Sequence, residues 1–160
     1  MAELTFSENE MIVSKTDIKG KITYGNYLFL KMAGYEESEI IGAPHNIIRH
    51  PDMPKVIFKL LWEYITKGNE VYAYVVNKSK NGDYYWVFVN ITASYNEKGK
   101  IIGYYSVRRK PTQQAMSIIK PLYKQLISAE KKGGIEASSQ ILNELVKKSG
   151  GRYDKFILSI

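Results

Sequence analysis

The hydrophobic residues of this chain form strand-like runs and helical patterns, and the order of these segments predicts an α+β domain. Runs of apolar, β-branched and aromatic residues, which favour strands, occur at residues 11–15, 21–25, 71–78, 83–95 and 100–110 and are separated by turn residues or by helical segments. Three segments with helical character, residues 27–34, 36–41 and 53–67, separate the second run from the third. Two short strands, small helices and a three-strand meander predict an antiparallel sheet with helices beside it.

Turn and cap residues mark where these elements begin and end. Asn26 is predicted to cap the first helix, because its side chain can accept a hydrogen bond from a free amide of the first turn. Asp52 is predicted to cap the third helix, with Pro54 in its first turn. The pair Asn81-Gly82 predicts a type I′ hairpin turn between the third and fourth strands.

The C-terminal third of the chain has a helical pattern throughout. Residues 111–132 predict an amphipathic helix that Pro121 should kink or interrupt. Gly133-Gly134 should break it, and residues 135–148 predict a second helix. An apolar tail follows, and we expect it to dock on its own domain or on another protein.

Composition narrows the class of protein. At 160 residues, 44% hydrophobic and 24% charged, the chain has the size and balance of a folded domain. It has no cysteine, which excludes disulfides, thiolate metal sites, iron–sulfur clusters and a cysteinyl photoadduct. No apolar run approaches the ~18 residues of a membrane span, and acids at the N-terminus argue against a signal peptide, so we expect a cytoplasmic protein.

The net charge of +7 has three interpretations. A solvated basic surface is the ordinary one. Attraction to the anionic inner leaflet of a membrane is the second. Nucleic-acid binding is the third, but the sequence has no zinc-finger spacing, RNP-like signature or familiar basic helix, so no nucleic-acid partner is predicted.

Residues 46–54, NIIRHPDMP, concentrate the chemistry of the chain. Arg49, His50 and Asp52 fall within four positions, beside Pro51 and Pro54. Ionisable groups this close to a core edge are costly to bury without partners. The segment is therefore predicted either to cap the following helix or to line a polar ligand pocket.

The order of elements, together with three motifs, resembles one family. RHPDMP, KNGDYYW and GYYSVRRKP followed by IIKPLYKQL are similar to the PAS domain of the aerotaxis-receptor type. The resemblance covers about residues 5–129. It implies a PAS fold, with a five-stranded antiparallel sheet, short helices on one face and C-terminal helices. We therefore predict a PAS sensor domain at residues 5–110 and a helical signalling or docking extension at residues 111–160.

The resemblance also implies a function. PAS domains of this type hold FAD noncovalently and report redox state to a chemotaxis apparatus. Because the chain stops soon after the PAS domain, it resembles the short soluble PAS proteins of split energy-taxis systems. The implied partner is a membrane-bound HAMP and methyl-accepting-type signalling protein acting in trans, which would bring the protein to the inner membrane. Self-association into a homodimer is a further expectation.

Particular residues follow from the resemblance and from their chemistry. Asn77 is expected to face the pyrimidine edge of the flavin, since an amide can match both a carbonyl and an N–H. Arg49 suits a pyrophosphate or an electron-rich ring, or else forms a salt bridge to Asp52 or Glu63. Tyr85 and Trp86 alternate faces of one strand, so only one can point into the pocket. The predicted cofactor-binding residues are Asn26, His45, Arg49, His50, Asp52, Trp62, Asn77, Tyr85 and Trp86.

One position departs from the family. Its members often carry a tryptophan at the start of the strand after Gly68, where this chain has Val71-Tyr72-Ala73. Either this chain lacks a ring that could cover the cofactor there, or Tyr72 or Tyr74 supplies it, so the affinity and the identity of the cofactor depend on this position.

Other functions remain open at this point. A haem sensor could use His45 or His50 as the axial ligand. A cofactor-free interaction module is a second alternative. A flavin enzyme is a third, but the sequence has no nicotinamide-binding GxGxxG and no evident substrate base, so a non-enzymatic switch is predicted.

Overall fold

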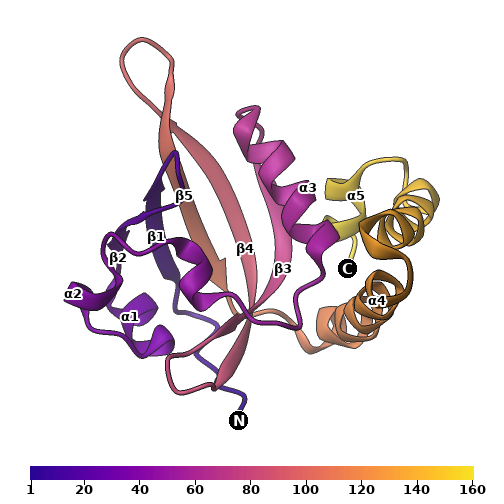
Figure 1. Ribbon diagram of the computed structural model, residues 1–160, viewed down its shortest axis with the longest axis horizontal. Coiled ribbons are helices and arrows are strands. Elements are labelled where there is room, and N and C mark those ends of the chain that lie inside the picture. The colour runs from indigo at the N-terminus through magenta and orange to yellow at the C-terminus, as the bar shows by residue number, and fades with distance from the viewer.

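The computed structural model describes all 160 residues, and its centre is an antiparallel sheet. Five strands lie in the spatial order β2-β1-β5-β4-β3. Their bounds are β1 Ile12–Asp17, β2 Ile22–Gly25, β3 Val71–Lys78, β4 Tyr84–Tyr95 and β5 Ile101–Arg109. This is the predicted PAS arrangement, in which the first and last strands pair in the middle of the sheet and bring distant segments together (Figure 1).

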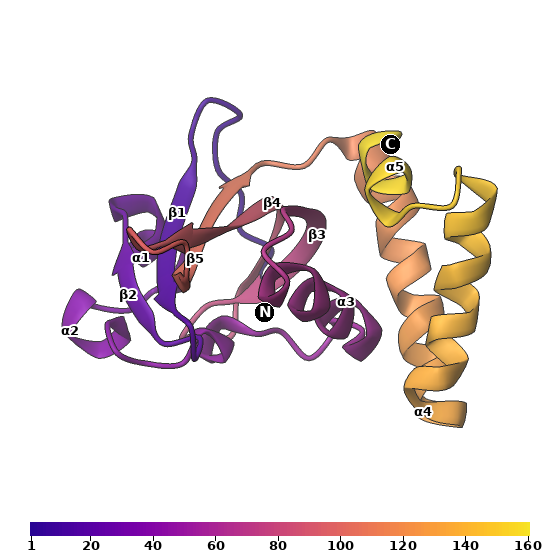
Figure 2. The ribbon, with the colours of Figure 1, turned by 90° about the horizontal axis from the view of Figure 1, so that it is seen from above.

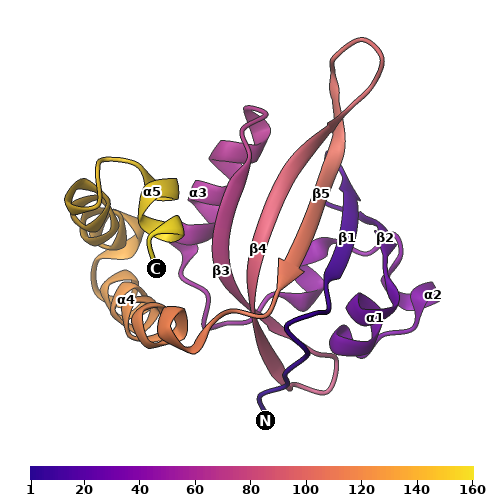
Figure 3. The same ribbon diagram turned by 180° about the vertical axis from the view of Figure 1, so that it is seen from behind.

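Short helices lie on one face of the sheet. Three α-helices and one 3-10 helix connect β2 to β3: α1 Tyr27–Ala33, α2 Glu37–Ile40, η1 His45–Ile48 and α3 Lys55–Thr66. The view from behind, Figure 3, shows β4, β5 and β1 in front, with no helix over them. The predicted helices are confirmed, and η1 is an element that the sequence pattern did not predict.

The cap of α1 is confirmed and the cap of α3 is wrong. Asn26 Oδ1 accepts from the Phe29 N–H at 3.0 Å, as an N-cap does. At α3, Pro54 occupies the N-cap position and the helix begins at Lys55. The Asp52 side chain is 76% exposed and makes no cap bond. A residue far along the chain binds the free amides of α3 instead, as described below.

The β3–β4 connection is longer than the predicted turn. Only glycines have positive φ in this chain, so Asn81 lacks the left-handed conformation that a type I′ turn demands. Gly82, at φ 94°, supplies it alone. The Ser79 N–H donates to the Asp83 carbonyl at 2.7 Å and closes a five-residue loop. The Asn81 side chain stabilises that loop by accepting from the Asp83 N–H at 3.0 Å.

The C-terminal third forms a helical hairpin followed by a short helix. The first part, α4, spans Gln113–Lys148, and the helix continues through Pro121. Gly134, at φ 70° and ψ −166°, is its one non-helical residue, and it divides α4 into the two antiparallel arms that Figure 2 shows. The final helix, α5, spans Tyr153–Leu158. No helix of the structure combines the length and the apolar character that crossing a membrane requires.

The hairpin and the tail pack on the chain's own sheet. Leu126 and Leu142 of the hairpin, and Tyr153, Phe156 and Ile157 of the tail, belong to the same hydrophobic core as the strands. The apolar tail therefore docks on its own domain, one of the two expected outcomes. This packing also covers the β3 edge of the sheet, which would otherwise expose unpaired backbone groups.

Candidate functional site

A cavity of about 400 Å³ lies between the sheet and the helices that connect β2 to β3. Its walls come from β1, η1, α3, β3, β4 and β5, so residues from nearly the whole PAS region meet there. The volume is at the lower end of the range for small-molecule sites. Ten of the twenty lining residues are hydrophobic, which suits a flat apolar ring with a polar edge.

One wall is the inner side of α3. Phe58, Leu61, Trp62 and Ile65 line the cavity, while Ile57 of the same helix is buried in the core. Trp62 is 48% exposed, and its ring lies 5.9 Å from that of Tyr104 on β5. The predicted apolar face of this helix thus serves both as core and as cavity wall.

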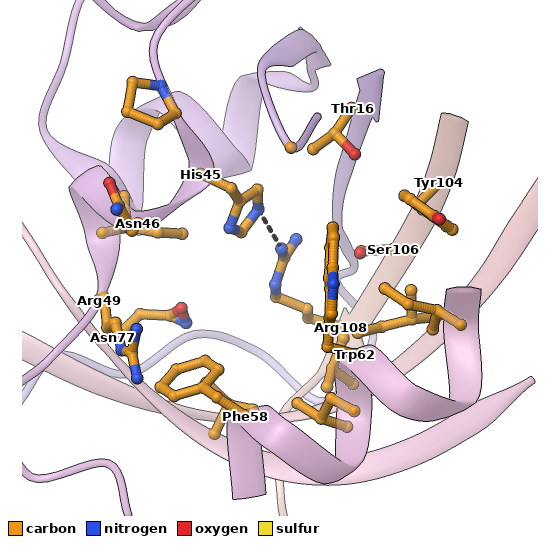
Figure 4. Close-up of a pocket in the computed structure, with 18 of the residues that line it drawn as sticks. Thr16, His45, Asn46, Arg49, Phe58, Trp62, Asn77, Tyr104, Ser106 and Arg108 are labelled. Atoms are coloured by element: carbon orange, nitrogen blue, oxygen red, sulfur yellow. Dashed lines mark hydrogen bonds between the residues drawn. The ribbon is translucent and has the colours of Figure 1, made fainter. Parts of the chain in front are cut away.

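A buried arginine occupies the opposite wall. Arg108 of β5 is only 3% exposed, and it faces no carboxylate (Figure 4). Its Nη2 donates to His45 Nε2 at 2.9 Å, whereas its Nη1 has no hydrogen-bond partner within the protein. Desolvation lowers the pKa of Arg108 to about 10, so the group remains charged at neutral pH.

His45 is fixed as a neutral acceptor by this contact. An arginine cannot accept a hydrogen bond, so His45 Nε2 must be unprotonated to receive one. Desolvation, followed by the nearby Arg108 charge, lowers the pKa of His45 to about 3. Ser14 Oγ, 3.3 Å from the same nitrogen, can donate as well. The imidazole therefore orients Arg108 without adding charge to the cavity.

Asn77 supplies a second unused donor. It lies on β3, is 3% exposed, and its Nδ2 has no partner within the protein. Backbone bridging between Asn77 and Arg49 holds the RHPDMP loop against this edge strand. Buried polar groups in proteins are nearly always paired, so two orphaned donors on residues that line one cavity point to an acceptor on a ligand.

Arg49 stacks on an aromatic ring at the cavity wall. Its guanidinium carbon lies 3.8 Å from the centre of the Phe58 ring, and it forms no salt bridge to Asp52 or Glu63. Desolvation lowers the pKa of Arg49, although the residue is exposed. Its five N–H groups are thus available to an anion beside the cavity.

Four of the nine predicted residues line the cavity. They are His45, Arg49, Trp62 and Asn77. Asn26 lies elsewhere, with its amide engaged by the Val13 N–H, the Phe29 N–H and the Met11 carbonyl. Tyr85 is buried on the inner face of the sheet, but it does not line the cavity, and its hydroxyl has no partner. Burial raises the pKa of Tyr85 to about 12.

His50, Asp52 and Trp86 meet on the other side of β3. They line a separate hollow together with Tyr84 and the first arm of α4. The His50 ring faces Tyr84 at 5.6 Å, and His50 Nδ1 accepts from the Asp52 N–H at 2.9 Å. Trp86 packs on Tyr123 at 5.7 Å. The RHPDMP motif is therefore divided, with its arginine beside the cavity and its histidine outside it.

Two expectations about aromatic residues are resolved by the alternation of β3 and β4. Of Tyr85 and Trp86, only Tyr85 lies on the inner face. Tyr72 and Tyr74 lie on the outer face, where both rings contact Phe88, so neither replaces the missing tryptophan. The rings that line the cavity are instead Phe58, Trp62 and Tyr104.

Sequence reasoning did not identify Arg108, and a signal for it was available. Tyr104, Ser106 and Arg108 alternate along β5 and all three line the cavity. The period of two places them on one face, and the same face carries inward-pointing Ser14 on the paired strand β1. A charged residue on the buried face of a central strand is unusual enough to indicate a ligand.

The fold and the site together define the class of this protein. The chain belongs to the PAS family, because the sequence model of that family, described as PAS fold, matches residues 22–108. It is a PAS domain of the aerotaxis-receptor type. Over 120 residues it is 41% identical to the aerotaxis receptor of Escherichia coli, an alignment that covers 75% of this chain and 24% of the receptor.

More distant relatives share the same region. The nitrogen fixation regulatory protein of Klebsiella pneumoniae is 24% identical over 97 residues, which are 61% of this chain and 20% of that protein. The chain thus spans only about a quarter or less of the length of these relatives.

Solved structures confirm the fold. The dark structure of the blue-light photoreceptor Aureochrome1 LOV superposes with a TM-score of 0.60 at 23% identity, covering 73% of this chain and 86% of that one. The LOV domain of a blue-light activated histidine kinase from Erythrobacter litoralis gives 0.58 at 18% identity, covering 64% and 97%.

Proposed function

We propose that this protein is a redox sensor that holds FAD noncovalently in the cavity and signals in trans to a membrane-bound chemotaxis-type receptor. The observation that carries the proposal is the pair of orphaned donors, Asn77 Nδ2 and Arg108 Nη1, on two residues that line the same cavity. The 41% identity to an aerotaxis receptor favours a flavin over other flat ligands with acceptor edges.

The residues present fit a flavin. Phe58, Leu61 and Trp62 provide an apolar wall for the ring system, and Asn77 and Arg108 provide donors for carbonyl oxygens at its polar edge. The cavity volume of about 400 Å³ suits the ring but not the whole dinucleotide. The phosphates would then lie outside, where the exposed Arg49 guanidinium offers a bidentate partner.

The proposed switch depends on how the hydrogen bonds of the cavity residues change when the ligand is reduced. When bound, a flavin supplies a ring whose hydrogen-bonding atoms change on reduction. Arg108 is a fixed cation that can only donate, whereas the Asn77 amide can donate or accept by turning over. A mismatch at either residue leaves a buried polar atom unsatisfied, at a cost of about 1–3 kcal/mol. That cost is large enough to shift a two-state element of the protein.

A haem sensor is less well supported by the same geometry. His45 Nε2, the nitrogen that faces the cavity, is occupied by Arg108, and axial ligation requires that hydrogen bond to break. His50 lies outside the cavity. We also propose that the protein signals rather than catalyses, and that it acts in the cytoplasm, at the inner membrane through its partner.

Absorption spectroscopy of the purified full chain tests the cofactor. We expect paired bands in the near-ultraviolet and blue that dithionite bleaches, and release of FAD on denaturation. A sharp Soret band would replace the proposal with a haem sensor. FMN in the released fraction would correct the identity of the flavin, and protein that stays colourless after incubation with FAD would refute flavin binding.

Co-purification tests the partner. The probe is a tagged membrane protein that carries a HAMP and a methyl-accepting-type signalling domain, from the same source as this chain. We expect retention that differs between oxidised and dithionite-reduced protein. Absence of retention in both states would refute signalling in trans through that class of receptor.

A further inference from the structure

The N-terminus of α3 is held by a carboxylate from the C-terminal hairpin. Glu130 Oε1 accepts from the Lys55 N–H at 2.8 Å, and Glu130 Oε2 accepts from the Val56 N–H at 3.0 Å. The local N-cap residue, Pro54, makes no side-chain cap bond. A residue 74 and 75 positions away thus supplies the acceptors that a helix normally finds at its own N-cap.

The second arm of the hairpin fixes the carboxylate. Ser138 Oγ donates to Glu130 Oε2 at 2.8 Å and also lies 3.0 Å from the Ile135 carbonyl. Ser138 is completely buried, at 0% exposure. The backbone reversal at Gly134 brings the two arms together and returns Ser138 to Glu130. We call Glu130, Ser138 and the amides of Lys55 and Val56 the Glu130 clasp.

The charge of the clasp matches its position. A helix N-terminus carries a partial positive charge, and a carboxylate there is stabilising. Hydrogen bonds to an ionised acceptor are about twice as strong as those between neutral groups. The clasp therefore joins the hairpin to α3 more firmly than the apolar contacts between them would alone.

The helix that the clasp holds forms one wall of the cavity. Phe58 follows Val56 by two residues, and it is the ring on which the Arg49 guanidinium stacks at 3.8 Å. Trp62 lies one turn further on and closes the cavity against Tyr104. On one side α3 contacts β3 and β4, and on the other it contacts α4. A shift of its N-terminus would move both aromatic walls relative to the fixed residues of the sheet.

We propose that Glu130 is a positioning residue that couples the cavity to the C-terminal hairpin. It sets the position of α3, and through α3 the fit of the ligand. Coupling between two sites is reciprocal, so a ligand that shifts α3 must change the hold of the hairpin by the same factor. The identity of the ligand rests on the function proposed above, whereas the clasp itself does not.

Variants of the full chain test the proposal with FAD as the probe. Glu130→Ala removes the clasp, Glu130→Gln keeps the shape without the charge, and Ser138→Ala removes only the bond from the second arm. We expect Glu130→Ala to weaken FAD binding about three- to thirtyfold, the range that the loss of a helix cap represents. Glu130→Gln and Ser138→Ala should fall between Glu130→Ala and the unaltered protein. Glu136→Ala, at an exposed position of the same hairpin, is the matched control and should leave FAD affinity unchanged.

Amide hydrogen exchange supplies the readout that a merely structural role would not move. In the unaltered protein, reduction with dithionite should change exchange in α4 as well as in α3. In Glu130→Ala that change should be confined to α3, with faster exchange at Lys55 and Val56. If α4 responds equally in both proteins, or if FAD affinity is the same in Glu130→Ala and Glu136→Ala, the proposed coupling is wrong.

A ligand-free measurement separates the clasp from the flavin proposal. The chain has two tryptophans, Trp62 and Trp86, so Trp86→Phe leaves Trp62 as the reporter of the cavity wall. In that background we expect Glu130→Gln to shift the emission of Trp62, with Glu136→Ala as the control. If the protein binds no FAD, the proposed function fails, but the emission of Trp62 still tests whether the clasp links the hairpin to the cavity wall. A shift supports the clasp as the link between hairpin and cavity wall, and identical emission refutes it.

Discussion

At the scale of single residues, the pairing of Arg108 with His45 defines the polarity of the cavity. A buried guanidinium usually has an anionic partner, and here it has a neutral imidazole. Because His45 carries no proton on Nε2, it orients Arg108 through Nη2, while Arg108 Nη1 has no partner within the protein. Asn77 adds an amide that is equally unpaired. The site is thus prepared for a ligand rich in acceptors.

Replacing Asn77 tests whether its unpaired amide binds an acceptor group of the ligand. Asn77→Leu keeps the side-chain size and removes both polar groups, so flavin affinity should fall by about 1–3 kcal/mol, or roughly 5- to 150-fold. Thermal stability without ligand should not fall, since the variant removes an orphaned buried amide. Fluorescence titration with FAD and a melting curve measure the two effects. Asn90→Leu, on the outer face of the sheet, is the control and should leave affinity unaltered.

His45 predicts a particular dependence of stability on pH. Its pKa is about 3 in the folded protein and about 6.5 in the unfolded chain, so the unfolded state binds the extra proton between these values. Stability from this group is complete above pH ~6.5 and is lost as pH falls, by at most about 1.4 kcal/mol per pH unit.

Urea unfolding at pH 7.0, 6.0 and 5.0 measures this loss, in a window above most carboxylate titration. The chain has two histidines, so His45→Gln and His50→Gln separate their contributions. We expect the free energy of unfolding to depend less steeply on pH mainly in His45→Gln. If the free energy of unfolding of that variant depends on pH as steeply as that of the unaltered protein, His45 gains a proton in the folded state over this pH range.

At the scale of elements, the β3 edge strand depends on segments that follow it and precede it. The Tyr74 carbonyl accepts from the Tyr123 hydroxyl of α4, and the Val76 N–H donates to Met53 Sδ at 3.4 Å. The outward groups of the edge are therefore satisfied within the chain. Desolvation raises the pKa of both Tyr123 and Tyr153, so both phenols remain neutral at the junction of hairpin, tail and sheet, where the Tyr123 hydroxyl is the donor.

The tail helix α5 should stabilise the whole domain. Phe156→Ala removes a ring that is 4% exposed and should reduce the free energy of unfolding by about 3–5 kcal/mol. Leu158→Ala in the same helix removes a side chain that is 57% exposed and should change it by less than about 0.5 kcal/mol. Chemical denaturation measures both. Equal, small effects would mean that α5 is not docked in solution.

At the scale of the whole molecule, the PAS sheet and the C-terminal helices share one hydrophobic core. Removing residues 135–160 would therefore expose the core and take Ser138 out of the Glu130 clasp, and it would not simply delete a docking arm. The division into a domain at residues 5–110 and an extension at residues 111–160 remains a prediction about folding and signalling units. The shared core favours unfolding in a single step.

Thermal unfolding followed by two probes tests whether the sheet and the C-terminal helices unfold in a single step. Far-ultraviolet circular dichroism reports mainly the helices, and tryptophan fluorescence reports Trp62 and Trp86, so one shared core predicts coincident midpoints. FAD at about a hundred times its Kd should add ~2.7 kcal/mol and raise both midpoints together by roughly 5–10 °C. If FAD does not raise the unfolding midpoint measured for the helices, both the single core and the clasp are contradicted.

Local patterns were sufficient to predict most of the fold. Runs of β-branched and aromatic residues between turns placed all five strands, helical spacing placed α1, α3 and both arms of α4, and Asn26 capped α1 as expected. These features depend on neighbours within a few residues, where period and capping chemistry act directly. Four cavity-lining residues, His45, Arg49, Trp62 and Asn77, could also be named, from the resemblance to a known family and from the chemistry of their side chains.

The tertiary structure decided the features that join distant segments. Packing of η1 against the sheet brought His45 to Arg108 of β5, 63 positions away, and no local pattern encodes such a pair. The failed cap at Asp52 has the same cause, since Glu130 reaches the α3 amides only after the hairpin has folded back. Sequence by itself determined which elements form and which faces are apolar, because those follow from short-range geometry. The contents of the cavity and its link to the hairpin were decided by packing, which only the complete chain specifies.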